Sequence, residues 1–214
     1  MPETVNGQRT YDGRARRARA ERTREQILHA ARELFLAQGY GPTTVAAIAA
    51  RAGASAETIY KTFGGKAGLV RAIHGRSLLG EGAVGAEQRS DAAQAEAVEG
   101  RAVLERFGVF VAEVAPLVMP VMLLIRDAAA GGDTDMAALL ADVEASRYQR
   151  MLHNARTLID HDLLSPHRSS AQAADVMWAY TAPGLYEDLV IKRSWAAADY
   201  GRFIGNALVA ALLE

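Results

Sequence analysis

Residues 43–66 constrain the fold more than any other stretch, because start and stop signals for two short helices are crowded into them. Thr44 and Ser55 are good N-caps, since a hydroxyl can accept a hydrogen bond from a free backbone N–H in the first helical turn. Gly53 can end the first helix in the left-handed conformation, and the glycine pair at 64–65 can end the second. The sequence therefore predicts two helices joined by a tight turn.

Each of these helices has one apolar side. In the first, apolar residues recur at helical spacing at Val45, Ile48, Ala49 and Ala52. The second turns Ile59 and Phe63 inward, which leaves Ala56, Glu57, Thr58, Tyr60 and Lys61 outward. Two helices joined by a short turn that contains glycine form the helix-turn-helix pattern, whose second helix enters the DNA major groove. Many small helical proteins contain such a pair, so the spacing alone leaves both interpretations open.

The surrounding sequence resembles the N-terminal domain of the TetR/AcrR family of bacterial transcription regulators. The similarity runs without a gap over residues 23–73, about a quarter of the chain. It is carried by Thr-Arg-Glu-Gln-Ile-Leu, Ala-Arg-Glu-Leu-Phe, Thr-Thr-Val, Ala-Gly-Ala-Ser, Thr-Ile-Tyr-Lys-Thr-Phe and Gly-Gly-Lys-Ala-Gly-Leu. The resemblance implies an all-α homodimer that binds a palindromic operator in double-stranded DNA and is released by a small molecule.

The resemblance also implies roles for single residues. The residues that match phosphate contacts are Thr44, Tyr60 and Lys66, those that match base-reading positions are Ala46, Ala56, Glu57, Thr58 and Lys61, and Ser55 belongs to the same surface. Ala46 departs from the polar residue usual in the family, and Ala56 offers only a methyl group, which suits a thymine methyl. Glu57 is best tolerated opposite a cytosine amino group. Base reading is therefore expected to rest on Lys61, Thr58 and DNA shape.

Charge is distributed unevenly along the chain. Residues 1–76 carry 13 Lys and Arg against 6 Asp and Glu, whereas residues 77–214 carry 11 against 19. This asymmetry indicates a basic, DNA-facing end and an acidic body. Residues 1–13 show no periodicity and are expected to lack fixed structure.

Six guanidinium groups follow within eleven residues, at Arg14, Arg16, Arg17, Arg19, Arg22 and Arg24. They could be the solvated, fraying end of a helix. They could also form an arm that tracks phosphates or enters the minor groove beside the operator. We favour the second interpretation, with residues 1–19 as a flexible basic arm.

The chain as a whole predicts an all-helical protein of about nine helices. Residues 20–76 are expected to form the three-helix helix-turn-helix domain, and residues 77–214 a ligand-binding and dimerisation bundle. The helix after Lys66 should reach residue 88, softened by Gly75, Gly80, Gly82 and Gly85, because each glycine costs about 1 kcal/mol in a helix interior. Further helices are expected at 92–114, 121–130, 136–160, 169–190 and 195–213.

Prolines and small residues shape the expected bundle. Pro116 and Pro120 are expected to break the chain between two helices, and Pro183 to kink another, because proline removes a backbone hydrogen bond. The last two helices pair small and aliphatic residues. They are expected to form the homodimer interface as a four-helix bundle between protomers.

Methionine and aromatic residues inside the bundle suggest a ligand cavity, although each could equally be plain core. The candidates are Phe107, Phe110, Met119, Met122, Met151, Trp178 and Tyr186, with Arg147 as the polar member. Arg147 is expected to pair with an acidic group of a ligand, or otherwise with Glu113 or Asp175. A pocket of this kind is mostly apolar and on the order of several hundred Å³.

Several classes of function have no support in the sequence. The absence of cysteine excludes disulfides and thiolate chemistry and fits a reducing compartment. The longest apolar run, Val114–Ile125, is short of the roughly 20 residues that a membrane span needs, so a cytoplasmic protein is expected. The five histidines lack paired metal-ligand spacing, and no phosphate-binding loop follows a strand, so neither a metal, a cofactor nor an enzyme is expected.

The favoured interpretation is a repressor that a mostly apolar effector releases from its operator. One alternative is a ligand-independent DNA-binding dimer, an activator or architectural protein whose body is only core. Another is a small-molecule-binding helical enzyme with a vestigial DNA-binding domain. An enclosed cavity on the order of several hundred Å³ in the body is expected for the first interpretation and not for the ligand-independent dimer.

Overall fold

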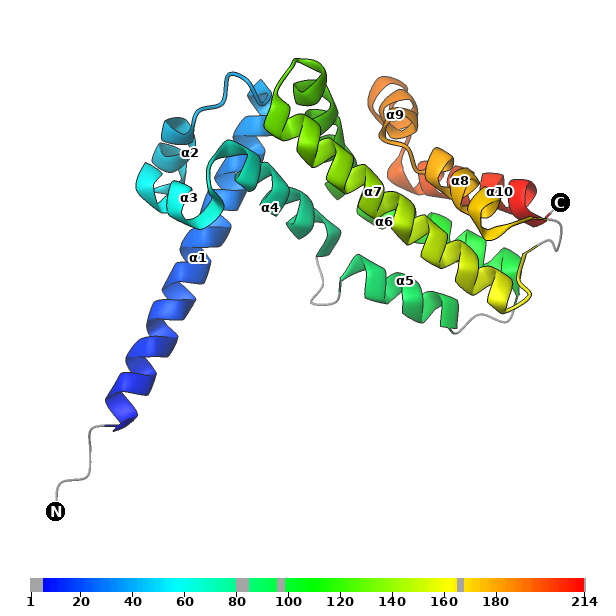
Figure 1. The fold of residues 1–214 in the computed structure, drawn as a ribbon, viewed down its shortest axis with the longest axis horizontal. Coiled ribbons are helices and arrows are strands. Elements are labelled where there is room, and N and C mark those ends of the chain that lie inside the picture. The colour runs from blue at the N-terminus through cyan, green and yellow to red at the C-terminus, as the bar shows by residue number, and fades with distance from the viewer. Residues whose placement is uncertain (1–5, 80–84, 96–98, 165–167, 214) are drawn as a thin grey trace. The chain divides into compact units, whose positions relative to one another are not determined.

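The computed structural model describes residues 6–79, 85–95, 99–164 and 168–213. Every regular element within these ranges is a helix (Figure 1), which confirms the expected all-helical class. The chain divides into two compact units, Met1–Ile73 and His74–Glu214. Each unit is described by itself.

The first unit is built on the long helix α1 (Asn6–Gln38). Two short helices, α2 (Val45–Ala52) and α3 (Ala56–Phe63), follow it, and α4 (Lys66–Leu79) begins in this unit and crosses the boundary at residue 73. Apolar residues from all four helices are buried together, among them Ile27, Phe35, Ile48, Ile59 and Leu69. Phe35 also stacks on the buried Tyr40, with ring centroids 5.7 Å apart.

Helix α1 begins at Asn6 rather than near residue 20, so the expectation that residues 6–13 lack fixed structure is wrong. Residues 14–24 consist only of Arg, Ala, Glu and one Thr. Arginine, alanine and glutamate are among the better helix formers, which explains why the helix continues through this largely exposed basic stretch. The four arginines expected in a flexible arm, Arg14, Arg16, Arg17 and Arg19, are therefore exposed on a helix.

The second unit is a bundle around α6 (Gly100–Ala130). α7 (Thr134–Asp160) and α10 (Ala197–Leu213) pack against α6, and α8 (Ser170–Tyr180) packs against both α7 and α10 (Figure 1). α5 (Ala86–Ala95) contacts α6 and α7. A short α9 (Pro183–Tyr186) continues into the π-helical segment η1 (Glu187–Lys192).

The predicted break at Pro116 and Pro120 is wrong, because α6 runs through both prolines. An interior proline costs a helix about 3 kcal/mol. Burying one large apolar side chain contributes about 1.5–3 kcal/mol, and Val118, Val121 and Met122 are all buried around these prolines. A continuous apolar helix is therefore the lower-energy arrangement.

α6 is long and apolar enough to cross a membrane by length and composition alone. More than half of its most apolar window is buried inside the unit, as in the core helix of a soluble bundle, so this resemblance to a span is weak.

Pro183 is the first residue of α9 and does not kink a longer helix, because α8 has already ended at Tyr180. Its missing N–H is harmless in a first helical turn. Gly80 and Gly82, part of the expected softening after α4, lie outside the described residues.

The backbones of α6 and α10 touch directly. A Cβ atom added to Gly201 would overlap the carbonyl oxygen of Gly108 and lie 2.6 Å from the Cβ of Ala112. On α10, Tyr200 and Ile204 are fully buried beside this crossing. Glycine is therefore required here for close approach of two helices.

Candidate nucleic-acid interface and internal cavity

Helices α2 and α3 have the caps that the sequence predicts. The Thr44 hydroxyl accepts a hydrogen bond from the Ala47 N–H at 3.1 Å, and the Ser55 hydroxyl accepts one from the Thr58 N–H at 3.0 Å. Gly53 and Gly64 end the two helices with φ of 63° and 77°. Both helices and the turn between them are thus set by contacts a few residues apart in sequence.

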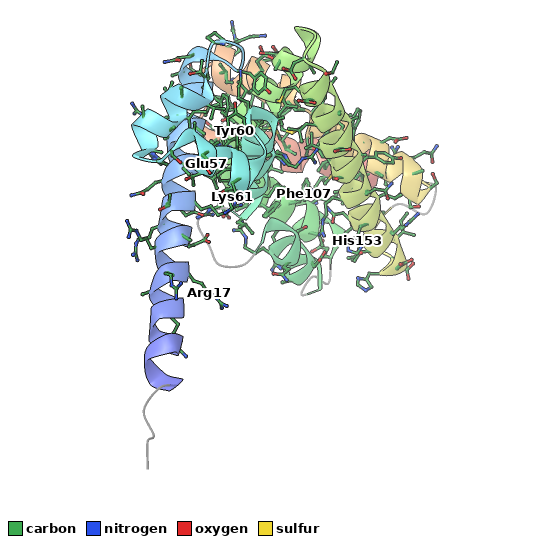
Figure 2. The ribbon with its side chains drawn as sticks, turned by 60° about the vertical axis from the view of Figure 1, so that its left-hand side comes forward. Arg17, Glu57, Tyr60, Lys61, Phe107 and His153 are labelled. Atoms are coloured by element: carbon green, nitrogen blue, oxygen red, sulfur yellow. The ribbon has the colours of Figure 1, made fainter. Side chains whose placement is uncertain are left out.

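The outward side of α3 is exposed, as predicted. Ile59 is fully buried, whereas Tyr60 is 58% exposed. Ala56, Glu57 and Lys61 are also exposed, and Figure 2 shows Glu57, Tyr60 and Lys61 together on this helix. Thr58 is only half-buried, but its hydroxyl is 2.8 Å from that of Ser55, so the helix cap already uses this group.

The starts of α2 and α4 supply the remaining candidates. Thr44 and Ala46 are exposed at the start of α2. The Lys66 ammonium donates to the carbonyl oxygen of Gly41 at 3.2 Å and lies 4.2 Å from the centre of the Tyr40 ring. Because an ammonium group has three donors, Lys66 is oriented by these contacts and can still bind an anion.

Contacts from α1 hold this surface in place. Arg51 on α2 forms an ion pair with Glu33 on α1 at 2.9 Å, and this hydrogen bond lowers the pKa of the Glu33 carboxyl. The Arg24 guanidinium lies 4.9 Å from the centre of the Phe63 ring at the end of α3. α1 therefore fixes the helix before α3 and the last turn of α3 itself. Arg17, one of the exposed α1 arginines, is labelled in Figure 2.

The second unit contains a partly open cavity of about 160 Å³. Six of the eight pocket candidates line it, namely Phe107, Phe110, Met119, Met122, Arg147 and Met151. His74 and Leu78 from α4 complete one part of the wall. The cavity is smaller than the several hundred Å³ expected, and Val111, Val114 and Val118 of the unbroken α6 are also part of its wall.

Trp178 and Tyr186 were predicted to line the pocket, but they do not. Trp178 is 36% exposed, and its ring lies 4.6 Å from the Arg147 guanidinium carbon. Tyr186 is buried in the core, edge-on to Tyr200 with ring centroids 5.4 Å apart. The chain turns between Tyr180 and Pro183, so residues on the two sides of this turn do not share one helical face.

Arg147 is held by its own protein. It pairs with Glu144 at 2.7 Å and donates to the Trp178 carbonyl oxygen at 2.7 Å and to the Thr181 hydroxyl at 3.2 Å. The predicted pairing with Glu113 or Asp175 is wrong. Glu113 pairs with Arg89, and Asp175 accepts from the Tyr148 hydroxyl.

Several polar residues of the cavity wall were not predicted from the sequence, namely His74, Ser90, Ser146, Arg150, Asn154 and Thr181. Arg150 and Asn154 follow Arg147 at i+3 and i+7, so the helical spacing that selected Arg147 also points to them. Burial lowers the pKa of His74. Among the described residues that line the cavity, none is acidic. Within the described ranges, no group of three or more acidic or histidine side chains is placed to hold a metal ion.

Residues 27–73 match the family model described as bacterial regulatory proteins, tetR family. This segment contains α2, α3 and the first half of α4. Among curated proteins, no sequence matches the chain.

Solved structures share the fold over nearly the whole chain. SmeT in complex with triclosan has a TM-score of 0.68 at 22% identity, covering 90% of this chain and 92% of that one; SmeT is the repressor of the Stenotrophomonas maltophilia multidrug efflux pump SmeDEF. NalD from Pseudomonas aeruginosa, the secondary repressor of the MexAB-OprM multidrug efflux pump, has a TM-score of 0.68 at 18% identity, covering 91% and 98%. A putative transcriptional regulator from Saccharomonospora viridis in complex with choline has a TM-score of 0.65 at 20% identity, covering 89% and 97%. At these identities the likeness establishes the fold.

Proposed function

Because this protein carries a TetR-family helix-turn-helix domain and has the fold of TetR-family transcription regulators, we propose that it is a homodimeric repressor. It binds a palindromic operator, and a small-molecule effector releases it. The exposed outward side of α3, on a helix capped at both ends and held by α1, is the observation that carries this proposal.

The roles of the surface residues follow from their chemistry. Lys61 is the exposed cation of α3 and the strongest candidate for reading a base or binding a phosphate. Tyr60, Thr44 and Lys66 supply a phenol, a hydroxyl and an oriented ammonium for phosphates. Ala46 and Ala56 offer methyl groups for apolar contact, and Glu57 offers a carboxylate that accepts hydrogen bonds. Ser55 and Thr58 act mainly by fixing the start of α3, because their hydroxyls are bonded to each other and to the helix.

Dimerisation through α8 and α10 would give the protein the two-fold symmetry of a palindrome. These helices pack together, and both turn large apolar side chains outward: Trp178 and Phe203 are each 36% exposed. Exposed Ala198 and Ala210 on α10 leave room for close approach of a second copy. Two recognition helices must be about 34–36 Å apart, or a multiple of that, to enter major grooves on one side of DNA.

Effector control would act through α4. This helix begins with Lys66 on the proposed DNA-binding surface and contributes His74 and Leu78 to the cavity wall. A ligand that binds two arrangements of α4 with unequal affinity shifts the protein between them. The solved structures of similar fold that hold triclosan and choline support a ligand role for this body.

Binding to DNA that flanks the protein's own coding region tests the proposal. Footprinting should reveal a protected palindrome, and Lys61→Ala should weaken binding to it at least about fivefold, the cost of one lost base contact. Lys192→Ala is the matched control, because it removes the same exposed side chain from the second unit. Equal affinities for both variants, or no protected sequence, would contradict the assignment of α3.

A further inference from the structure

Two hollows in the second unit meet at the same side chains. The inner one is the 160 Å³ cavity, and the outer one is a shallow surface hollow lined by Asp91, Ala145, Ser146, Gln149, Arg150 and His153. Ser146 and Arg150 belong to both walls. Arg150 therefore stands where the outer hollow gives way to the inner cavity.

Arg150 and Arg147 differ in how fully their guanidinium groups are used. Arg147 has three acceptors, which are Glu144, the Trp178 carbonyl and the Thr181 hydroxyl, and it also stacks on the Trp178 ring. Arg150 pairs through Nη2 with the Asp91 carboxylate at 2.5 Å, and within the described residues this is its only ion pair. A guanidinium has five donors. Arg147 is thus a structural residue, whereas Arg150 retains donors for a ligand.

The partner of Arg150 can be displaced. The Asp91 side chain is 49% exposed, comes from α5, and also contacts the His153 Nε2 at 3.3 Å. His153, on α7, is labelled in Figure 2. Asp91 lines the outer hollow but not the inner cavity, whose described lining residues include no acidic side chain. An anion that enters through the outer hollow would reach Arg150 and would have to displace one carboxylate, that of Asp91.

The inner cavity sets the size of the part of a ligand that it can enclose. An apolar protein cavity of about 150 Å³ is large enough to bind benzene. The cavity here is close to that volume, and Phe107, Met119 and Met151 provide apolar wall. The fitting group is therefore a single ring or a short acyl chain.

Building on the proposed function, we infer that the effector is a compact carboxylic acid with an apolar body of about one ring. Its carboxylate replaces that of Asp91 on Arg150, and its apolar body occupies the inner cavity. Asp91 of α5 pairs with both Arg150 and His153 of α7, and Arg89 of the same helix pairs with Glu113 of α6. Effector binding breaks the Asp91–Arg150 pair, so it weakens the attachment of α5 to α7.

Three probes of one shape test the charge of the effector. These are 3-phenylpropanoate, 3-phenylpropan-1-ol and 3-phenylpropylammonium, titrated calorimetrically into the DNA-free protein at fixed pH and ionic strength. The carboxylate should bind tightest and the ammonium weakest. Arg150→Gln should weaken carboxylate binding about tenfold to a hundredfold, the range for a hydrogen bond between charged groups, and change alcohol binding less than about twofold.

Asp91→Asn is the decisive second variant, because it should tighten carboxylate binding several-fold by removing the competing anion while leaving Arg150 in place. Arg101→Gln, which removes an exposed arginine outside both hollows, should leave all three affinities unchanged. Alcohol binding as tight as carboxylate binding, no gain in Asp91→Asn, or no binding of any probe would overturn the inference. Operator binding by the same preparation is measured separately, so a failure here leaves the proposed repressor untouched.

Discussion

The contact between α6 and α10 makes a sharp prediction about glycine. Gly201→Ala adds one methyl group where the nearest Cβ, that of Ala112, would be 2.6 Å away and the Gly108 carbonyl closer still. Carbon atoms make favourable contact at about 3.5–4.0 Å, so the two helices must separate by roughly 1 Å. Both obstacles belong to a rigid helix rather than to the end of a flexible side chain.

The magnitude follows from two opposed effects. Overpacking typically costs about 1–3 kcal/mol, and a clash with backbone belongs at the upper end. Alanine regains about 1 kcal/mol over glycine in a helix interior. The net loss in the free energy of unfolding is therefore about 2 kcal/mol, which lowers Tm by about 4–8 °C in a chain of this size.

Gly75→Ala is the matched control, because Gly75 lies inside α4 and an added Cβ would meet nothing within 4 Å. This variant should gain about 1 kcal/mol and melt about 2–4 °C higher. Calorimetric melting of wild type and both variants gives the comparison. If Gly201→Ala melted at or above the wild-type temperature, the two helices could not be in backbone contact.

Three other perturbations have defined outcomes. Tyr200 is fully buried, its hydroxyl has no hydrogen-bond partner among the described residues, and burial raises its pKa to about 12. Tyr200→Phe should therefore raise the free energy of unfolding by about 1 kcal/mol. A lower Tm for this variant would show that the hydroxyl has a partner. Burial lowers the pKa of His74, so below pH 6.5 the unfolded chain binds a proton at this residue more readily than the folded chain does. The free energy of unfolding should therefore be at its full value above pH 6.5 and fall below that pH, by at most about 1.4 kcal/mol per pH unit. Denaturant titrations of wild type and His74→Gln should differ in this slope, and parallel pH profiles would reject the assignment. Replacing Arg14, Arg16, Arg17 and Arg19 by Gln should reduce the salt dependence of operator binding by up to about 3.6 in log–log slope per protomer, whereas an unchanged slope would show that α1 does not contact phosphates.

Local signals decided the helix-turn-helix segment. A cap such as Thr44 or Ser55 bonds to an N–H three residues away, and Gly53 ends its helix by its own left-handed conformation. These interactions need no distant partner, so the sequence alone predicts them. The same holds for the outward side of α3, which follows from the spacing of Ile59 and Phe63.

The start of α1 also depends on local sequence, although residues 6–13 were wrongly predicted to lack fixed structure. The stretch 14–24 lacks an apolar stripe, but its composition favours a helix. Helical periodicity detects a buried face, and it gives no signal for a helix that stays in solvent.

The tertiary structure decided the body of the protein. The sequence predicts that Pro116 and Pro120 break the helix, but the packing of α7 and α10 around α6 makes a continuous helix favourable. The sequence predicts that Arg147 contacts a ligand, but in the structure its guanidinium donates to the carbonyl oxygen of Trp178, thirty-one residues away. Gly108 and Gly201 meet only because two helices distant in sequence cross there. The sequence determines the hydrogen bonds and caps that each helical turn can form with residues a few positions away. Contacts between residues distant in sequence depend on how the helices pack, and those contacts shape the cavity and its charge.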